Sequence, residues 1–123
     1  MDKIHLLGKD HAITLPDFTA REELLVAYHE GNTRKGITLL RAYSAILGLC
    51  TRLGRSCGAD YGKHRFDALA YGGEVYGWLR QQGATQADIA AQAIPVLTLL
   101  VEKSFPTVAE VETAKGNFEG RAE

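Results

Sequence analysis

Cysteine is scarce in this sequence, and so are the features that mark secreted or membrane proteins. Two cysteines in 123 residues are too few for a disulfide-rich secreted scaffold. The longest nearly uninterrupted apolar run, Ile94–Val101, is far shorter than the roughly 20 residues that span a bilayer. The first residues, Met1–His5, lack the basic cluster and apolar stretch of a signal peptide. We therefore expect a soluble, cytoplasmic protein.

The composition lacks any bias that would prevent a folded core. Hydrophobic residues make up 46% and charged residues 24%, which excludes collagen-like sequence and extensive disorder. The chain has no internal repeat and no low-complexity linker. A chain of this length fits one compact domain, so we expect a single domain over residues 1–123. Within it we expect a β-hairpin in 1–16, a helical core in 19–118 and a frayed tail in 119–123.

Signatures of catalysis and of metal or cofactor binding are absent as well. Cys50, Cys57 and His64 are too widely spaced and too few for a zinc site, which needs four ligands in close pairs. Cys50 fits a small buried hydrophobic residue, and a disulfide to Cys57 is disfavoured in a reducing compartment. Gly72–Gly77 matches neither phosphate-binding nor dinucleotide-binding glycine patterns. We therefore expect no catalytic, metal or cofactor site. One enzymatic hypothesis remains: an active site built from Cys57, His64 and a carboxylate such as Asp60.

Short apolar runs at the start of the chain predict a small β-hairpin. They flank a polar turn, Gly8–His11, and Pro16 ends the second strand because proline cannot donate to the ladder. We expect His5 and His11 to face one another across the strands. A lone hairpin is marginal in water, so it must pack on helices or join the strands of a neighbour.

Helical periodicity and capping residues predict helices through the rest of the chain. A capping box at Thr19–Glu22 opens the first helix, which ends at Gly31. Asn32 or Thr33 caps a longer helix that runs to about Leu53 and ends at Gly54. Its core stripe follows spacings of four, three, four and three: Leu39, Tyr43, Ile46, Cys50 and Leu53.

A loop of about nine residues, 55–63, precedes a third helix from about His64 to Gln82. Three glycines inside that helix predict either a close approach to another helix backbone or a kink: Gly72, Gly73 and Gly77.

Two more helices follow. Thr85–Asp88 resembles the cap of the fourth helix, which Pro95 should kink or break and Phe105 should end. A capping box at Thr107–Glu110 opens a last helix to about Phe118. These elements predict a mainly α fold: a small N-terminal β-hairpin followed by about five helices packed as one α-rich domain.

Charge is distributed unevenly along the chain. Residues 1–32 carry six acids and three bases, a net charge of −3, and residues 66–123 carry eight acids and four bases, a net charge of −4. Residues 33–65 carry seven bases and one acid, a net charge of +6. This basic middle fits nucleic acid, an acidic partner, the acidic ends of another copy, or simply solvated helix faces. A sequence pI near 6.4 argues against nucleic acid.

Basic and aromatic residues of the central helices are the candidate interface residues. Arginine pairs with carboxylates, and large aromatic side chains supply contact area at interfaces. The candidates are Arg34, Arg41, Arg52, Arg55, Tyr76 and Trp78.

The order of the expected elements resembles that of the small tail assembly chaperones of long-tailed bacteriophages and their prophages. The segments that suggest this resemblance are Gly83–Ile89 and Phe105–Glu119. The resemblance implies a non-enzymatic protein of the host cytoplasm that coats a helical client, the tape-measure protein, and keeps it soluble. It also implies helical or ring-like homo-oligomers, and it implies no catalytic residues. The alternative from the residues themselves is a small helical nucleic-acid-binding regulator that uses the basic segment 34–65.

Overall fold

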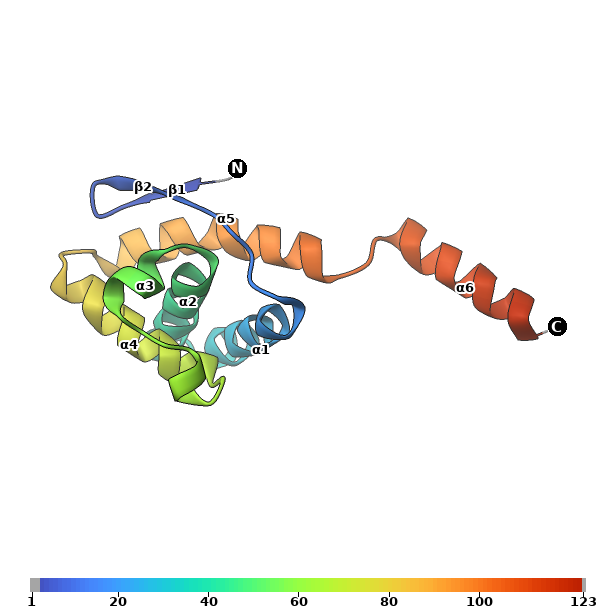
Figure 1. Ribbon diagram of the computed structural model, residues 1–123, viewed down its shortest axis with the longest axis horizontal. Coiled ribbons are helices and arrows are strands. Elements are labelled where there is room, and N and C mark those ends of the chain that lie inside the picture. Colours follow the sequence, from blue (N-terminus) through green and yellow to red (C-terminus); the bar gives the residue numbers. More distant parts are fainter. Residues whose placement is uncertain (1–2, 123) are drawn as a thin grey trace.

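The computed structural model describes residues 3–122, which form a two-stranded sheet, six α-helices and one short 3-10 helix (Figure 1). This arrangement confirms the mainly α fold with a small N-terminal hairpin. In chain order the elements are β1 (Lys3–Leu6), β2 (Lys9–Ala12), α1 (Phe18–Arg34), α2 (Gly36–Cys50), α3 (Leu53–Cys57), η1 (Gly62–His64), α4 (Ala68–Gln81), α5 (Gln86–Ser104) and α6 (Val108–Ala122).

Helix α2 forms the centre of the core, and α1, α4 and α5 pack around it (Figure 1). The predicted stripe is buried at Tyr43, Ile46 and Cys50, because a helix with apolar residues on most of its surface is stable only when covered. Ser44 is buried among them, and its hydroxyl donates to the carbonyl oxygen of Leu40 at 2.8 Å. This local bond satisfies the hydroxyl without a partner from another helix.

Glycines in α1 and α4 let these helices lie directly against α2. A Cβ atom on Gly72 would lie 2.0 Å from the carbonyl oxygen of Arg41, so the predicted close approach is confirmed. Gly31 has the same role in α1, where a Cβ would lie 2.9 Å from Cα of Leu39. The expectation that Gly31 ends the first helix is therefore wrong, since its lack of a side chain serves packing.

The other helix ends of this region also differ from expectation. Asp17 caps α1 by accepting a hydrogen bond from the amide of Ala20 at 2.9 Å, and Thr19 lies inside the helix. Neither Asn32 nor Thr33 caps α2; the chain turns at Lys35, which has a φ of 60°. Helix α2 ends at Cys50.

The expected stop at Gly54 is instead a buried position inside α3. A Cβ there would lie 2.1 Å from the hydroxyl oxygen of Tyr71. Lack of space for a side chain, and not a left-handed backbone, is why glycine stands at this position.

The hairpin exists, but its turn lies earlier than expected. Leu7 and Gly8 form the turn with φ values of 57° and 74°, so Lys9–His11 belong to the second strand. His5 consequently pairs with Asp10 and not with His11, and Nδ1 of His5 lies 2.9 Å from the Asp10 carboxylate. Hydrogen bonds from His5 and Lys3 lower the pKa of Asp10.

The segment 55–63, expected as a loop, contains the end of α3 and the start of η1. Helix α4 begins at Ala68 rather than at His64, with Asp67 as its cap. Arg65 and Phe66 have φ values of 53° and 61°, which no α-helix allows, so a helix from His64 is impossible.

Helix α5 has the predicted cap and runs through Pro95 without a break. Thr85 and Asp88 form a complete capping box. Helix α6 begins as predicted, with Thr107 accepting from the amide of Glu110 at 3.1 Å, but it continues past Phe118 to Ala122. The expected frayed tail is thus helical in 119–122, and residue 123 lies outside the described residues.

Helix α6 projects away from the other helices (Figure 1). All of its described side chains, Val108–Asn117, are exposed.

Candidate functional site

Helix α1 buries one face and leaves apolar side chains on the other. Leu24 and Ala27 are buried, whereas Phe18 and Val26 keep 56% and 68% of their surface exposed. Two hollows lie along this helix, and both are lined by Glu22 and Val26. We call the two hollows together the α1 groove.

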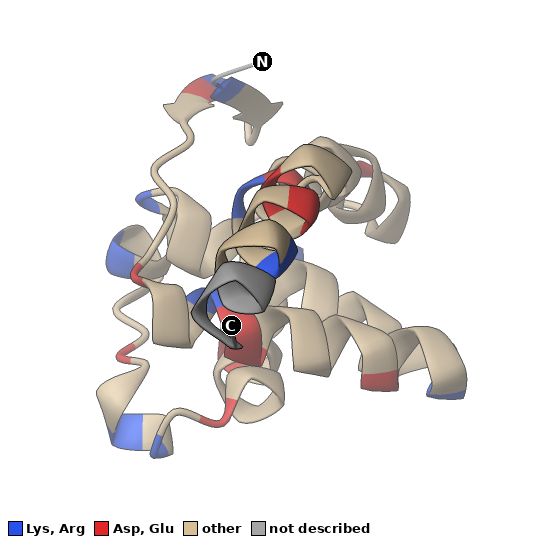
Figure 2. Ribbon diagram, turned by 90° about the vertical axis from the view of Figure 1, so that its right-hand side faces the viewer, with Lys and Arg blue, Asp and Glu red and all other residues tan. Residues whose placement is uncertain are grey.

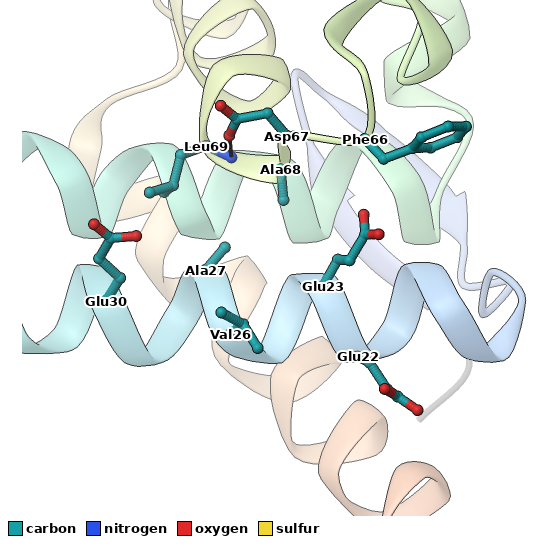
Figure 3. A pocket seen from close by; sticks show the side chains of 9 residues that line it. All are labelled: Glu22, Glu23, Val26, Ala27, Glu30, Phe66, Asp67, Ala68 and Leu69. Atoms are coloured by element: carbon teal, nitrogen blue, oxygen red, sulfur yellow. Dashed lines mark hydrogen bonds between the residues drawn. The ribbon is translucent and has the colours of Figure 1, made fainter.

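The first hollow, of about 310 Å³, lies between α1 and the start of α4 (Figure 3). Glu23, Ala27 and Glu30 point from α1 toward α4, while Glu22 points to the other side of the helix (Figure 3). Phe66, which is largely exposed, lies at one end. The positive φ of Phe66, just before the cap of α4, sets its side chain outside the core.

The second hollow, of about 490 Å³, lies between α1 and the end of α5 and shares Glu22 and Val26 with the first. Its lining is mainly apolar, with Phe18 and Leu25 from α1 and Phe105 from the end of α5. The two hollows adjoin along α1, where Glu22 and Val26 line both.

Arg21 holds α1 against the end of α5 at this groove. Its Nη1 donates to the carbonyl oxygen of Lys103 at 3.3 Å, and its guanidinium carbon lies 5.6 Å from the centre of the Phe18 ring. This hydrogen bond and cation–π contact place the Phe18 ring beside the second hollow.

Carboxylates surround the apolar surface of the first hollow: Glu22, Glu23, Glu30 and Asp67. Glu23 accepts a hydrogen bond from the Tyr61 hydroxyl, and Glu30 lies 3.3 Å from Nη2 of Arg34. Asp67 is occupied as the cap of α4. Among the side chains that the structure describes, the Glu22 carboxylate has no ion-pair partner. An apolar helix with lysine or arginine beside its apolar stripe is therefore complementary to the groove.

The predicted interface arginines lie outside the α1 groove. Arg52 and Arg55 line a separate groove of about 280 Å³, and the other residues that line it are Thr14, Leu15, Pro16, Leu49 and Thr51. Both arginines are exposed, and neither pairs with a carboxylate of the described chain. These two candidates therefore line a common hollow.

The other four candidates are spread over three helices. Arg34 ends α1 and pairs with Glu30, and Arg41 lies on α2 beside Gly73 of α4. Tyr76 and Trp78 are half-buried on α4 and pack against the core. The Tyr76 hydroxyl also accepts a hydrogen bond from Gln86 at 2.9 Å. A contact with another molecule stays a prediction for all four.

The enzymatic hypothesis gains no support from the geometry. Nε2 of His64 lies 2.5 Å from the carboxylate of Glu74, and Asp60 accepts from the amide of Gly62. Burial raises the pKa of Cys57, whereas a nucleophilic thiol needs a lowered one. Within residues 3–122 no three histidine, cysteine or acidic side chains come together as a metal site would require.

The sequence reasoning missed the exposed apolar residues of the α1 groove. Phe18, Glu22, Val26 and His29 recur at spacings of four, four and three, which places them on a second face of the first helix. That signal was present, but a scattered exposed valine or phenylalanine is ordinary on a surface. Only the position of Phe66 and Phe105 beside that face reveals a groove.

Comparisons with protein families, curated proteins and solved structures found no match to this chain. Among the described residues, no helix combines the length and apolar character needed to cross a membrane.

Proposed function

We propose that this chain is a non-enzymatic assembly chaperone that binds an elongated helical client along α1 and associates with further copies of itself. The α1 groove carries this proposal: exposed apolar side chains lie next to carboxylates along one helix. A client helix that covers Phe18, Val26 and Phe66 would gain about 1 kcal/mol from each, because roughly half of each side chain is still exposed.

The resemblance of the chain to phage tail assembly chaperones supports the same function. In that setting the client is a tape-measure-like protein, whose long apolar helices need cover until the tail tube forms, and the site of action is the host cytoplasm. The chemistry of the groove specifies the client further: an amphipathic helix whose apolar stripe is bordered by basic residues, because Glu22 and Glu23 lie along the apolar ridge.

A labelled synthetic peptide tests this function directly. The peptide is a helix of about 20 residues with leucine at helical spacing and lysine on both sides of the stripe. Fluorescence anisotropy should report binding to the native chain, with affinity that falls as salt rises. A peptide of the same composition in scrambled order should bind much more weakly, because it presents no apolar stripe.

Val26→Lys is the decisive variant, because Val26 is largely exposed and its replacement leaves the core intact. Lysine removes apolar contact and repels the basic peptide, so affinity should fall at least about tenfold. Ile94→Lys is the matched control: Ile94 is an exposed apolar residue of α5 that lines neither hollow, and its replacement should leave affinity unchanged. Equal affinity of both variants, or no binding by the native chain, would overturn the proposal.

A further inference from the structure

Exposed apolar side chains gather where α1, α5 and the start of α6 meet. Phe18, Val26 and Phe105 line the second hollow, and Val108 and Val111 follow within the first six residues after it. Each of the five keeps between 49% and 80% of its surface exposed. Helix α6 nevertheless projects away from the hollow (Figures 1 and 2). Apolar surface of this extent indicates a place that another segment covers.

The connection between α5 and α6 allows α6 to swing while Phe105 stays in place. The amide of Phe105 donates to the carbonyl oxygen of Val101 at 3.2 Å, which fixes Phe105 to the end of α5. Its φ of −118° and ψ of 143° are extended, as the following Pro106 requires. Rotation is therefore left to Pro106 and Thr107, and it moves the whole of α6, which begins at Val108. All described side chains of α6 are exposed, so no packing opposes this motion.

One face of α6 matches the second hollow in length. Val108, Val111 and Lys115 follow at spacings of three and four, which places them on the same face. This face is about 10 Å long, and the hollow extends along α1 from Phe18 to His29, about 16 Å. The face of α6 therefore fits within the hollow, with its two valines against the apolar lining.

Both surfaces carry one cation and one anion. Lys115 lies within the face of α6 and Glu112 borders it, and neither has an ion-pair partner among the described side chains. Glu22 of the hollow is in the same state, and Arg21 uses one of its five donors, in its bond to the carbonyl oxygen of Lys103. Pairs of Lys115 with Glu22 and of Glu112 with Arg21 are thus complementary.

We infer that α6 folds back onto the second hollow of its own chain and competes there with the client helix. Figure 1 shows the open arrangement, in which the hollow is accessible. The inference rests on the proposed function, because it regulates access to the same site: α6 presents an apolar stripe with a lysine, as the client does. Since the client binds the open state, its apparent affinity falls in proportion to the fraction of chains that are open.

Amide hydrogen exchange, followed by NMR, tests the closed state without any peptide. Val111→Gln removes an apolar contact of α6, and Thr113→Gln on the opposite face is its matched control. Val111→Gln should speed exchange of the α6 amides about threefold, whereas Thr113→Gln should leave it near the native rate. Val26→Lys should speed the same amides from the other side of the contact, and Ile94→Lys should not. Exchange rates should be independent of protein concentration, because the contact lies within one chain.

The labelled basic peptide tests the competition. Val111→Gln should bind it about threefold more tightly than the native chain, because α6 no longer occupies the hollow. Thr113→Gln should bind it like the native chain. The factor measured by peptide binding should agree with the factor measured by hydrogen exchange, because both report the same closing equilibrium.

Three results would overturn the inference: α6 exchange that Val111→Gln and Val26→Lys leave unchanged, protection of α6 that rises with protein concentration, or peptide affinity that Val111→Gln leaves unchanged. Protection that rises with concentration would place α6 on a second copy. The two readouts also separate this inference from the proposed function. Peptide binding with unchanged α6 exchange would refute the closed state alone, whereas faster α6 exchange in Val111→Gln without peptide binding by any variant would refute the proposed function.

Discussion

Helices α2 and α6 both have 15 residues, but they have opposite surroundings. Helix α2 carries one charged residue, Arg41, and buries eight of its residues in the core. Helix α6 carries five charged residues, and all of its described side chains are exposed. Helices of equal length thus differ in what stabilises them: α2 has tertiary packing on most of its surface, whereas α6 has its cap at Thr107 and its own backbone hydrogen bonds.

The sequence of α2 is constrained by the core that it forms, whereas the surface of α6 is accessible to other molecules. Opening of α6 exposes no buried core, so it should occur without unfolding of α2. The α1 groove combines both properties, because one face of α1 belongs to the core and the other is accessible. Substitutions that distinguish the two regions therefore test the comparison.

The largest effect is expected for Ile46→Ala in α2. Ile46 has no exposed surface, so truncation leaves a cavity among α1, α4 and α5 and should lower the free energy of unfolding by about 2–5 kcal/mol. Val111→Ala in α6 is the matched control and should change that free energy by less than about 0.5 kcal/mol. Urea denaturation of dilute protein measures both. Comparable losses from the two variants would mean that α6 belongs to the cooperative core.

Smaller changes in the free energy of unfolding are expected for two glycines of α4, and the two changes should have opposite signs. Gly72→Ala places a methyl group against the backbone of α2 and should lower the free energy of unfolding by about 1–3 kcal/mol. At Gly77 a Cβ meets nothing within 4 Å, so Gly77→Ala should raise it by about 0.5–1 kcal/mol. Thermal and urea unfolding should agree on both signs. A stabilising Gly72→Ala would show that α2 and α4 do not approach this closely.

Much of the fold follows from local signals in the sequence. The capping box of Thr85 and Asp88 and the apolar stripe of α2 depend on residues three or four apart, so the sequence alone predicts them. The errors concern glycines with tertiary roles. Gly31 and Gly54 resemble helix stops in the sequence, whereas in the structure each leaves room for a distant neighbour, the backbone of α2 or the Tyr71 hydroxyl.

Less of the candidate site could be predicted. The spacing of three residues predicts that Arg52 and Arg55 lie close together. It does not predict that Leu15 and Pro16, which come from a segment far away in the sequence, line the same hollow. The α1 groove was missed for the same reason, since Phe66 and Phe105 join α1 only through the fold. Charge along the chain indicated a basic middle and acidic ends, but it gave no information about which carboxylates already have partners.

A last test of the buried centre of α2 is the response of stability to alkaline pH, which involves a single thiol. Burial raises the pKa of the Cys50 thiol from 9.0 to about 12. In the unfolded chain the thiol loses its proton above about pH 9, whereas the folded chain retains it. Stability is therefore unaffected by Cys50 below that pH, and it should fall by about 1.4 kcal/mol per pH unit as the pH rises toward the folded pKa.

Urea denaturation of the native chain and of Cys50→Ala from pH 8 to 11 isolates this contribution. The alanine variant should start less stable, because it leaves a small cavity, but its stability should fall less steeply above pH 9. Tyr71, whose pKa burial raises to about 12, is present in both proteins, so the part of its contribution that comes from burial cancels in the difference. Cys57→Ala is the control, because Cys57 is only half-buried. It should change the slope of the free energy of unfolding against pH less than Cys50→Ala does. Equal slopes for the native chain and Cys50→Ala would show that solvent reaches the centre of α2, which would remove the contrast with α6.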